Sequence, residues 1–405
     1  MPLFIAVHGG AGYHAVEDRK ATKNALKTSV RTALELCKAE DSSTVSRSAT
    51  GDGHLSNAAT AEVDAGLALS AVEAAIRVLE DDPILNAGYG SNLTEAGTVE
   101  CDAAIMSARA SSGSGAGASE FGSVAAAPGI KNPISAARAV LQNARRVDVL
   151  GRVPPMTLCG HGARGFARAH GVEVVPDDQL VSARARADWE YWSAQLRGSS
   201  STESMLQAES PTSRRLDSHQ DTVGAVCLHF PSSGARSAAA GVSSIRAVLA
   251  RQPSTAQGAG RDPLGSPTCK VDRVSGGWRN VADPILAGTG EAIMRANLAR
   301  RISEELDRAW DAQGQDRSVL SGSDEEDDDI ASIGNELDVH QILYDVLKKE
   351  FGHGRQEVGW DGCDQPTVGV LVIVGNGETV RLYSAFTAVK MAIAYAREGV
   401  SPQYA

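Results

Sequence analysis

The chain has 405 residues, of which 42% are hydrophobic, so it is long enough to bury a large core as one or two domains. Its formal net charge of -11 argues against binding of nucleic acid through phosphates, which needs clustered Lys and Arg. No apolar run approaches the roughly 20 residues of a membrane span, and the N-terminus lacks the basic leader of a signal peptide. We expect neither a nucleic-acid partner nor a membrane partner.

The six cysteines are scattered, without a close-spaced pair that would indicate a zinc site or a redox motif. Free thiols are usual in a reducing compartment. The sequence therefore favours a cytoplasmic or nuclear enzyme, and we expect no metal and no other cofactor.

The N-terminal half predicts alternating strands and helices from its apolar periodicity. A Ser70–Glu73 capping box predicts the start of the second helix. In order, the expected elements are a strand at 3–7, a glycine-rich turn at 8–14, a helix at 20–38, an inserted loop at 39–62, a helix from Ser70, strands at 98–106 and 122–126, and a helix at 134–143.

The C-terminal half predicts mainly strands, after a long polar leader at 182–220 that we expect to be flexible. An acidic loop at 321–330 contains six consecutive Asp and Glu residues. The remaining elements are strands at 223–229 and 238–243, a helix at 290–306, and strands at 367–374 and 380–385 around an Asn-Gly hairpin turn. Strands at both ends with helices between indicate an α+β fold of layered sheets and helices.

The Asp221-Thr222 pair places a hydroxyl residue between the polar leader and an apolar strand. An isolated Asp-Thr of this kind is usually an ordinary strand start. If the Asp221–Thr222 bond is cut, however, Thr222 carries a nucleophilic hydroxyl and an α-amino group. The amine has a reference pKa of about 7.7–8, so it can act as general base for its own side chain.

Three glycine-rich segments could surround such a nucleophile, although each is also compatible with an ordinary turn. The segment 8–12 follows a buried strand, where glycine lets another backbone approach closely. Asn86 and Asn92 flank a second segment and could donate hydrogen bonds to an oxyanion. The third, 287–291, is expected to open a helix whose free N–H groups suit a developing negative charge.

Taken together, the motifs resemble the type 2 asparaginase (isoaspartyl peptidase) family of N-terminal-nucleophile hydrolases, and within it the threonine aspartase (taspase) branch. The resemblance covers most of 3–170, then 221–244, 287–306 and the C-terminal hairpin. Its motifs are His8-Gly-Gly-Ala-Gly-Tyr-His14, Leu79-Glu-Asp-Asp-Pro83 running into Asn86-Ala-Gly-Tyr-Gly-Ser-Asn-Leu93, Val99-Glu-Cys-Asp-Ala-Ala-Ile-Met106, Gly129-Ile-Lys-Asn-Pro133, Asp221-Thr-Val-Gly-Ala-Val226 and Gly288-Thr-Gly-Glu291.

The resemblance implies a four-layer αββα sandwich and a single catalytic domain over 1–405. Self-cleavage would give an α piece, 1–221, and a β piece, 222–405, with α/β units paired as a homodimer. Carried over by position, Thr222 is the nucleophile and Gly10 faces its amine. The remaining implied roles are support of the reacting centre by Asn86, orientation of the nucleophile by the Ser244 hydroxyl and oxyanion binding by the backbone of Gly288.

Asp221 favours the taspase branch, because the β-aspartyl-peptidase relatives usually carry Gly before the nucleophile. The implied activity is a threonine endopeptidase that cleaves protein substrates after Asp. The alternative is a β-aspartyl peptidase or L-asparaginase.

The sequence at 245–287 departs from the family pattern. The family continues after its Ser-Ser pair with an Arg that grips the substrate carboxylate as a bidentate fork, and no counterpart is recognisable here. Arg261 is a conceivable substitute. Either a gene-model error or a degenerate pocket accounts for the departure, so a catalytically impaired relative is a further hypothesis.

Overall fold

The computed structural model describes most of the chain, and several sequence predictions lie outside the part that it describes. These are Asp221, Arg261, the leader beyond residue 198 and the acidic loop at 321–330. The described residues are 3–12, 18–49, 57–109, 118–146, 148–198, 222–230, 237–245, 271–274, 277–288, 293, 296–320, 338–351, 367–375, 380–388 and 390–405. Within these ranges, no helix combines the length and the apolar character needed to cross a membrane.

The larger sheet has eight strands in the order β12-β11-β1-β5-β6-β2-β3-β4. Its strands are β1 (Phe4–Gly12), β2 (Glu100–Arg109), β3 (Ala118–Pro128), β4 (Thr157–Cys159), β5 (Val223–His229), β6 (Ser237–Ile245), β11 (Lys390–Arg397) and β12 (Gln403–Tyr404). Neighbours are antiparallel, except that β3 and β4 are parallel. The strand that follows Thr222, β5, therefore lies in the middle of this sheet, between β1 and β6.

The smaller sheet has the order β10-β9-β8-β7. Its strands are β7 (Val271–Val274), β8 (Gly277–Gly288), β9 (Val368–Gly375) and β10 (Val380–Phe386). A buried apolar cluster joins the two sheets, with Val226 and Leu228 from the larger sheet and Leu371 and Ile373 from the smaller one. Because side chains alternate along a strand, this cluster identifies which residues of β5 face the smaller sheet.

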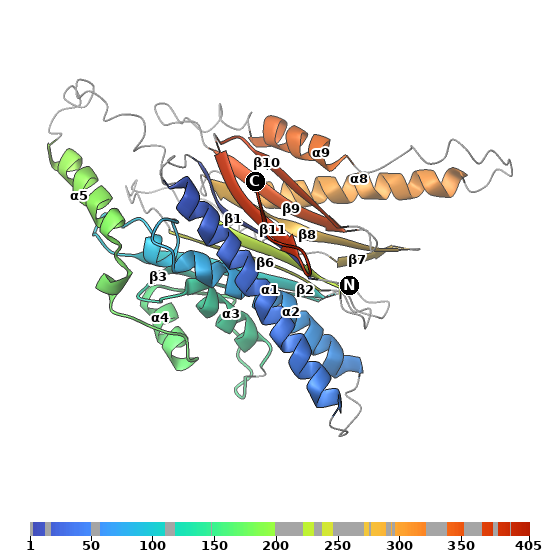
Figure 1. Cartoon of the computed structure of the whole chain (residues 1–405), viewed down its shortest axis with the longest axis horizontal. Coiled ribbons are helices and arrows are strands. Elements are labelled where there is room, and N and C mark those ends of the chain that lie inside the picture. The colour runs from blue at the N-terminus through green and yellow to red at the C-terminus, as the bar shows by residue number, and fades with distance from the viewer. Residues whose placement is uncertain are drawn as a thin grey trace.

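Helices pack on both sheets. Their bounds are α1 (Arg19–Ala49), α2 (Asn57–Glu80), α3 (Pro133–Ala144), α4 (Gly160–Ala169), α5 (Ala183–Gly198), α8 (Leu298–Leu320) and α9 (Val339–Asp345), with short turns η1 (Gly88–Gly90), η2 (Asp177–Leu180) and η3 (Val346–Phe351). α1, α2 and α3 contact the larger sheet, whereas α8 and α9 contact the smaller one (Figure 1). The chain is thus an α+β protein with two helix-covered sheets.

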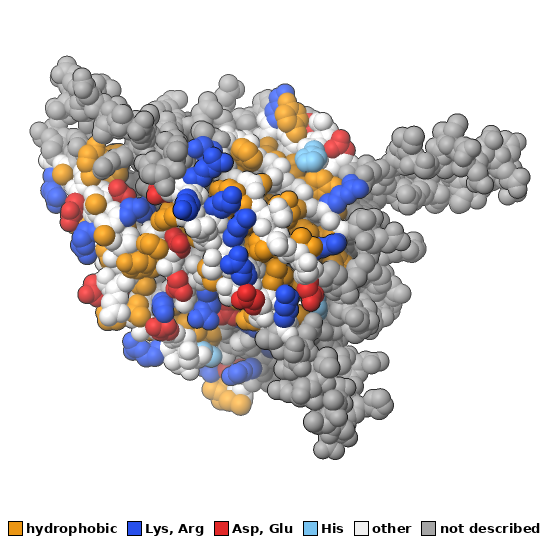
Figure 2. Space-filling model, in the orientation of Figure 1, with side chains coloured by type: hydrophobic (Ala, Val, Ile, Leu, Met, Phe, Trp, Pro, Cys, Tyr) orange, Lys and Arg blue, Asp and Glu red, His pale blue; other side chains and the backbone are white. Residues whose placement is uncertain are grey.

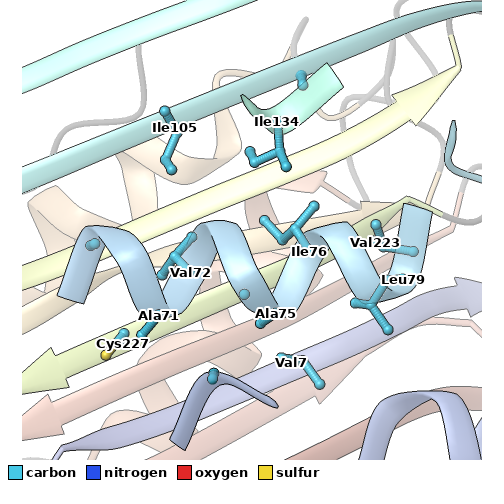
Figure 3. Close-up of a cluster of buried hydrophobic side chains, with 14 of the residues drawn as sticks. Val7, Ala71, Val72, Ala75, Ile76, Leu79, Ile105, Ile134, Val223 and Cys227 are labelled. Carbon is cyan, nitrogen blue, oxygen red and sulfur yellow. The ribbon is translucent and has the colours of Figure 1, made fainter. Parts of the chain in front are cut away.

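The apolar face of α2 forms the centre of the core under the larger sheet. Val72, Ile76 and Leu79 recur at helical spacing and are fully buried against Val223 of β5 and Ile105 of β2 (Figure 3). Complete burial of side chains of this size contributes about 1.5–3 kcal/mol each. The core therefore fixes the position of the strand that carries Thr222.

Helix α1 is amphipathic in the same way but presents a basic outer face. Its inner residues Leu26 and Val30 are buried, while Lys20, Lys23 and Arg31 are exposed. Figure 2 shows Lys and Arg side chains across the face of the molecule on which α1 lies. α1 therefore covers the larger sheet while its own outer surface stays solvated.

The first two helices are longer than predicted, which corrects the inserted loop at 39–62 and the helix start at Ser70. α1 extends to Ala49 and α2 begins at Asn57, so Ser70 lies inside a helix. The presumed capping residues make tertiary contacts instead. Arg138 of α3 donates to the Ser70 hydroxyl at 2.9 Å and to Glu73 at 2.6 Å, and the alanine-rich sequence before Ser70 favours helix.

Other helix and strand boundaries also differ from the predicted ones, each for a local reason. β1 continues through Gly12, with an irregular register between His8 and Ala11 in place of the expected turn. Within the helix predicted at 290–306, Ile293 is helical and α8 begins at Leu298, after Asn297, which adopts a left-handed conformation with φ of 50°. In the leader at 182–220, expected to be flexible, residues Ala183–Gly198 form α5, with its first turn capped by the Ser182 hydroxyl. The predicted helix at 134–143 and the four strands at 223–229, 238–243, 367–374 and 380–385 are confirmed.

Candidate active site

Thr222 immediately precedes β5 and is partly exposed. Val223 and Ala225 belong to the cluster under the helices, whereas Val226 and Leu228 belong to the cluster between the sheets. Strand alternation therefore directs Thr222 toward the space between the two sheets. A hydroxyl at this position can be reached from the end of the sheet pair while the strand behind it is held rigidly.

Two predicted residues lie level with Thr222 on the flanking strands. β1 pairs His8 with Gly224, so Gly10, two residues further along, lies level with Thr222. β6 pairs Ser243 with Val223, so the next step of the ladder brings Ser244 opposite Thr222. The structure describes the backbone of Ser244 but not its side chain, so the orienting role of its hydroxyl stays a prediction.

Gly10 has a φ of 109°, which only glycine adopts without strain. This conformation accompanies the register irregularity between His8 and Ala11 in the pairing with β11. The predicted glycine-rich turn is thus a distorted strand end beside Thr222. A side chain at Gly10 would strain the backbone at the point where it passes the candidate nucleophile.

His8 fills the space over Gly224. A Cβ atom added at Gly224 would lie 2.4 Å from His8 Nε2. Burial lowers the pKa of His8 from 6.5 to about 4, an effect that the nearby backbone of Thr222 partly offsets. Neither ring nitrogen has a hydrogen bond of normal geometry within the described residues. A neutral imidazole therefore lies next to the Thr222 backbone at pH 7.

Asn86 lies in the loop between α2 and η1 and is buried. Its Oδ1 atom accepts a hydrogen bond from the backbone N–H of Asn92 at 3.0 Å. The two asparagines that sequence reasoning treated as separate oxyanion donors thus close one loop together. Because η1 contacts β6, this loop lies near the strand that carries Ser244.

Gly288 ends β8 and pairs with Val368. Residues 289–292 lie outside the described part and Ile293 is helical, so the expectation that 287–291 opens a helix stays a prediction. The next residue of β9, Gly369, pairs with Ala287, and a Cβ atom added at Gly369 would lie 2.5 Å from Ala11 Cβ. Ala11 follows Gly10 in β1, so the Gly288 end of the smaller sheet lies at the same end of the sheet pair as Thr222.

Asp102 extends the candidate site along the sheet. It pairs with Ser244 across β2 and β6, and its Oδ1 accepts the backbone N–H of Ala126 at 2.6 Å. Ala126 has a positive φ of 45°, a strained conformation for a residue other than glycine. The Asp102 contact holds this strained turn of β3 beside the site.

Sequence reasoning gave no separate role to His8, Glu80 or Asp102. Each lies inside one of the recognised motifs, so motif membership was the available signal. Glu80, the last residue of α2, is fully buried, and burial raises its pKa from 4.5 to about 8. Nearby, the Cys101 thiol has its pKa raised to about 12 by burial and lies 3.3 Å from the Ser91 hydroxyl. These groups are therefore neutral at pH 7.

A comparison with protein families identifies the family of this chain. A family model described as asparaginase (Asparaginase_2) matches residues 1–244, which extends from β1 through the position level with Thr222 on β6. The chain belongs to the type 2 asparaginase family, whose members are N-terminal-nucleophile hydrolases.

Individual relatives match over different shares of the chain. The isoaspartyl peptidase/L-asparaginase of Xenopus laevis is 30% identical over 311 residues, which is 76% of this chain and 77% of the relative. The Bos taurus protein of the same name is 33% identical over 237 residues, 58% of this chain and 62% of the relative. A plant-type L-asparaginase of Pyrococcus abyssi is 43% identical over 129 residues, 32% and 36% of the two chains.

Proposed function

We propose that this chain is a self-activating threonine hydrolase with the four-layer αββα architecture, and that it cleaves protein substrates after Asp. The observation that carries the proposal is the position of Thr222, between the strand ends that hold Gly10 and Ser244 and beside the buried ring of His8. A hydroxyl at the start of the central strand, flanked by close backbone on both sides, is a suitable nucleophile once its amine is free.

In the proposed mechanism, the Thr222 hydroxyl attacks the scissile carbonyl and its own α-amine takes the proton. The amine then returns that proton to the leaving nitrogen, which leaves an ester between Thr222 and the acyl fragment. Water hydrolyses the ester with the same amine as base. Asn86 and the backbone of Gly288 support the negative charge on the carbonyl oxygen during each step.

Asp221 supports the choice of substrate, because an enzyme that frees its own nucleophile by cutting after Asp already accommodates Asp at that position. The second candidate is hydrolysis of β-aspartyl dipeptides or asparagine. It is favoured by the relatives, whose names describe isoaspartyl peptidases and L-asparaginases.

The first experiment tests self-activation by intact mass. We expect wild-type protein to split between Asp221 and Thr222 at neutral pH, and Thr222→Ala to remain one chain. Ser237→Ala is the matched control, because Ser237 is a buried hydroxyl at the opposite end of the β5–β6 ladder. A wild-type chain that stays intact after long incubation rules out the proposed activation.

The second experiment ranks substrates. Peptides with an internal Asp should be cleaved faster than asparagine or β-aspartyl dipeptides, and the reverse order would select the second candidate. Arg261→Ala should raise KM for the Asp peptide by a factor of about 10 to 150 if Arg261 binds its carboxylate, since a charge-assisted bond contributes about 1.5–3 kcal/mol. Feeble activity that this change leaves unaltered would indicate the catalytically impaired relative.

A further inference from the structure

Glu80 is the last residue of α2, and its side chain points into the protein interior, near α3 and β6. It is completely buried. Its Oε1 atom accepts the backbone N–H of Ile134 at 3.0 Å, in the first turn of α3. The Ser243 hydroxyl of β6, also completely buried, lies close enough to influence the same carboxyl group.

The other carboxyl oxygen and the serine hydroxyl are unusual. Among the described residues, Glu80 Oε2 and Ser243 Oγ have no hydrogen bond of normal geometry. Buried polar atoms almost always have a partner, and leaving one without a partner is costly. A protonated carboxyl group has one O–H to donate and the serine oxygen can accept it, so one proton on Glu80 satisfies both atoms.

The surroundings of Glu80 keep that proton in place. Burial raises its pKa most, and the neighbouring Asp81 carboxylate raises it further. On β2, Cys101 is a neutral thiol. From the turn before α3, Asn132 contacts Glu80 and also donates to Asp81 at 3.0 Å. None of these groups is a cation that could balance an ionised Glu80.

Glu80 also reaches two parts of the candidate site. Ser243 pairs with Val223, next to Thr222. The backbone of Glu80 lies so close to Gly88 that a Cβ added there would be 2.4 Å from the Glu80 carbonyl oxygen. Gly88 begins η1, in the loop segment that contains Asn86. One buried residue thus touches both the strand beside the nucleophile and the loop beside it.

We propose that Glu80 is a positioning residue, whose carboxyl O–H bond to Ser243 holds the end of β6 in register beside Thr222. Glu80 is remote from substrate in this arrangement and acts through the two backbone segments. The consequence for catalysis rests on the proposed role of Thr222, whereas the consequence for the backbone does not.

The first test measures the backbone alone, in the uncut Thr222→Ala chain, by amide hydrogen exchange expressed as protection factors. Glu80→Ala should lower protection at least tenfold at 222–224 and 241–245. Glu80→Gln keeps an N–H donor and should retain protection at pH 7. Raising the pH from 7 to 9 should lower protection in the Glu80 chain and leave the Gln variant unchanged, because only Glu80 ionises.

Glu73→Ala is the matched control, since Glu73 lies on the same helix but pairs with Arg138. At each pH, the Glu73→Ala chain should show the same protection at 241–245 as the parent Thr222→Ala chain. If Glu80→Ala does not fold, Ser243→Ala replaces it. This change removes the acceptor of the Glu80 O–H bond, so it should lower protection at 222–224 and 241–245 already at pH 7 and leave little further loss between pH 7 and pH 9. Unchanged protection in every variant overturns the proposal.

The second test measures self-cleavage with Thr222 present. The wild-type rate should fall as pH rises through about 8, the pKa of Glu80, and Glu80→Gln should lack this fall. An identical fall in both chains contradicts the proposal. Absence of cleavage in every chain counts against self-activation only, since the exchange experiment uses an uncut protein.

Discussion

The two sheets of this molecule are built differently, although they share one apolar interface. The larger sheet is buried on both faces and carries Thr222, Gly10 and Ser244 at one end. The smaller sheet contributes the Gly288 end of β8 and lies outside the residues that the family model matches, 1–244. The matched sequence therefore covers β1 to β6 of the sheet that holds the nucleophile, whereas β11 and β12 of that sheet lie outside it.

The two sheets differ in the family match because packing restricts the choice of residue more tightly around β5 than in β9. In β5, Gly224 packs directly against the ring of His8. In β6, a Cβ atom added at Gly241 would lie 2.9 Å from the side chains of Val72 and Ile76. In β9 of the smaller sheet, Gly369 makes one comparable approach, to Ala11. The other residues of β9 alternate between two apolar clusters, a pattern that many sequences satisfy. A close backbone contact requires one particular residue, usually glycine, whereas apolar alternation requires only that a residue be hydrophobic.

The largest effect should follow from Gly224→Ala. The new Cβ would lie 2.4 Å from His8 Nε2 in a strand paired on both sides, so Thr222 must move. We expect self-cleavage to fall about 100-fold or more, the cost of a displacement near 1 Å at a reacting group. Gly369→Ala in the smaller sheet meets the flexible Met391 thioether at 2.7 Å and Ala11 Cβ at 2.5 Å. It should destabilise by about 1–3 kcal/mol but slow cleavage less than tenfold. Equal losses would show that both sheets shape the site equally.

A second prediction compares the helices that cover the two sheets. Ile76 of α2 and Ile302 of α8 are both fully buried, and replacing either by Ala should cost about 2–5 kcal/mol in the free energy of unfolding. Ile76→Ala should also make room for Gly241→Ala, so the double variant should be more stable than the two single changes added together. Urea unfolding of the uncut chain measures all four variants, and simple additivity would mean that Ile76 does not confine Gly241.

A third prediction concerns acid stability, which His8 should limit. The folded state has a His8 pKa of about 4 against 6.5 when unfolded, so the unfolded chain binds more protons between these values. Stability should therefore fall as pH drops from 6.5 to 4, by about 3 kcal/mol in total. Glu80 acts oppositely, because its raised pKa makes stability fall as pH rises from 4.5 through about 8. In the uncut chain, His8→Gln should flatten the acid side, and an unchanged slope would contradict the buried neutral imidazole.

The smallest effects concern ion pairs. Arg138 and Glu73 are mostly buried, with 17% and 18% of their side chains exposed, whereas Arg308 on α8 is 64% exposed beside Glu305. Arg138→Ala should cost about 1.5–3 kcal/mol and Arg308→Ala only about 0.3–0.5. Thermal unfolding at low and high salt checks both, and a larger salt response is expected for Arg308. Equal costs would mean that the helices over the two sheets are equally solvated.

Sequence reasoning located the strands and helices whose signals are local. β5 and β6 were found from their apolar runs, and β9 and β10 from the Asn-Gly turn between them. Ser70 was misread because its capping pattern is local while its actual partner, Arg138, is 68 residues away. Local propensity cannot show which distant side chain a polar residue will meet.

The candidate site follows the same division. Motifs identified Thr222, Gly10 and Asn86, because glycine and the nucleophile leave recognisable sequence. They could not show that Glu80 is buried against the start of α3, 54 residues away, or that His8 loses its charge by burial. These properties arise from packing between α2, α3 and the larger sheet, which no single segment encodes.

The strand order also determines what happens to the two pieces after a cut before Thr222. In the larger sheet, β1 of the first piece lies between β11 and β5 of the second, and β6 of the second piece lies beside β2 of the first. Separating the pieces would break three hydrogen-bonded ladders and expose the core. The two pieces of one molecule should therefore stay together and not exchange with pieces of other molecules. In a cell that expresses both the wild-type gene and a Thr222→Ala gene, each wild-type molecule would be cut and each variant molecule would stay uncut, without mixed molecules.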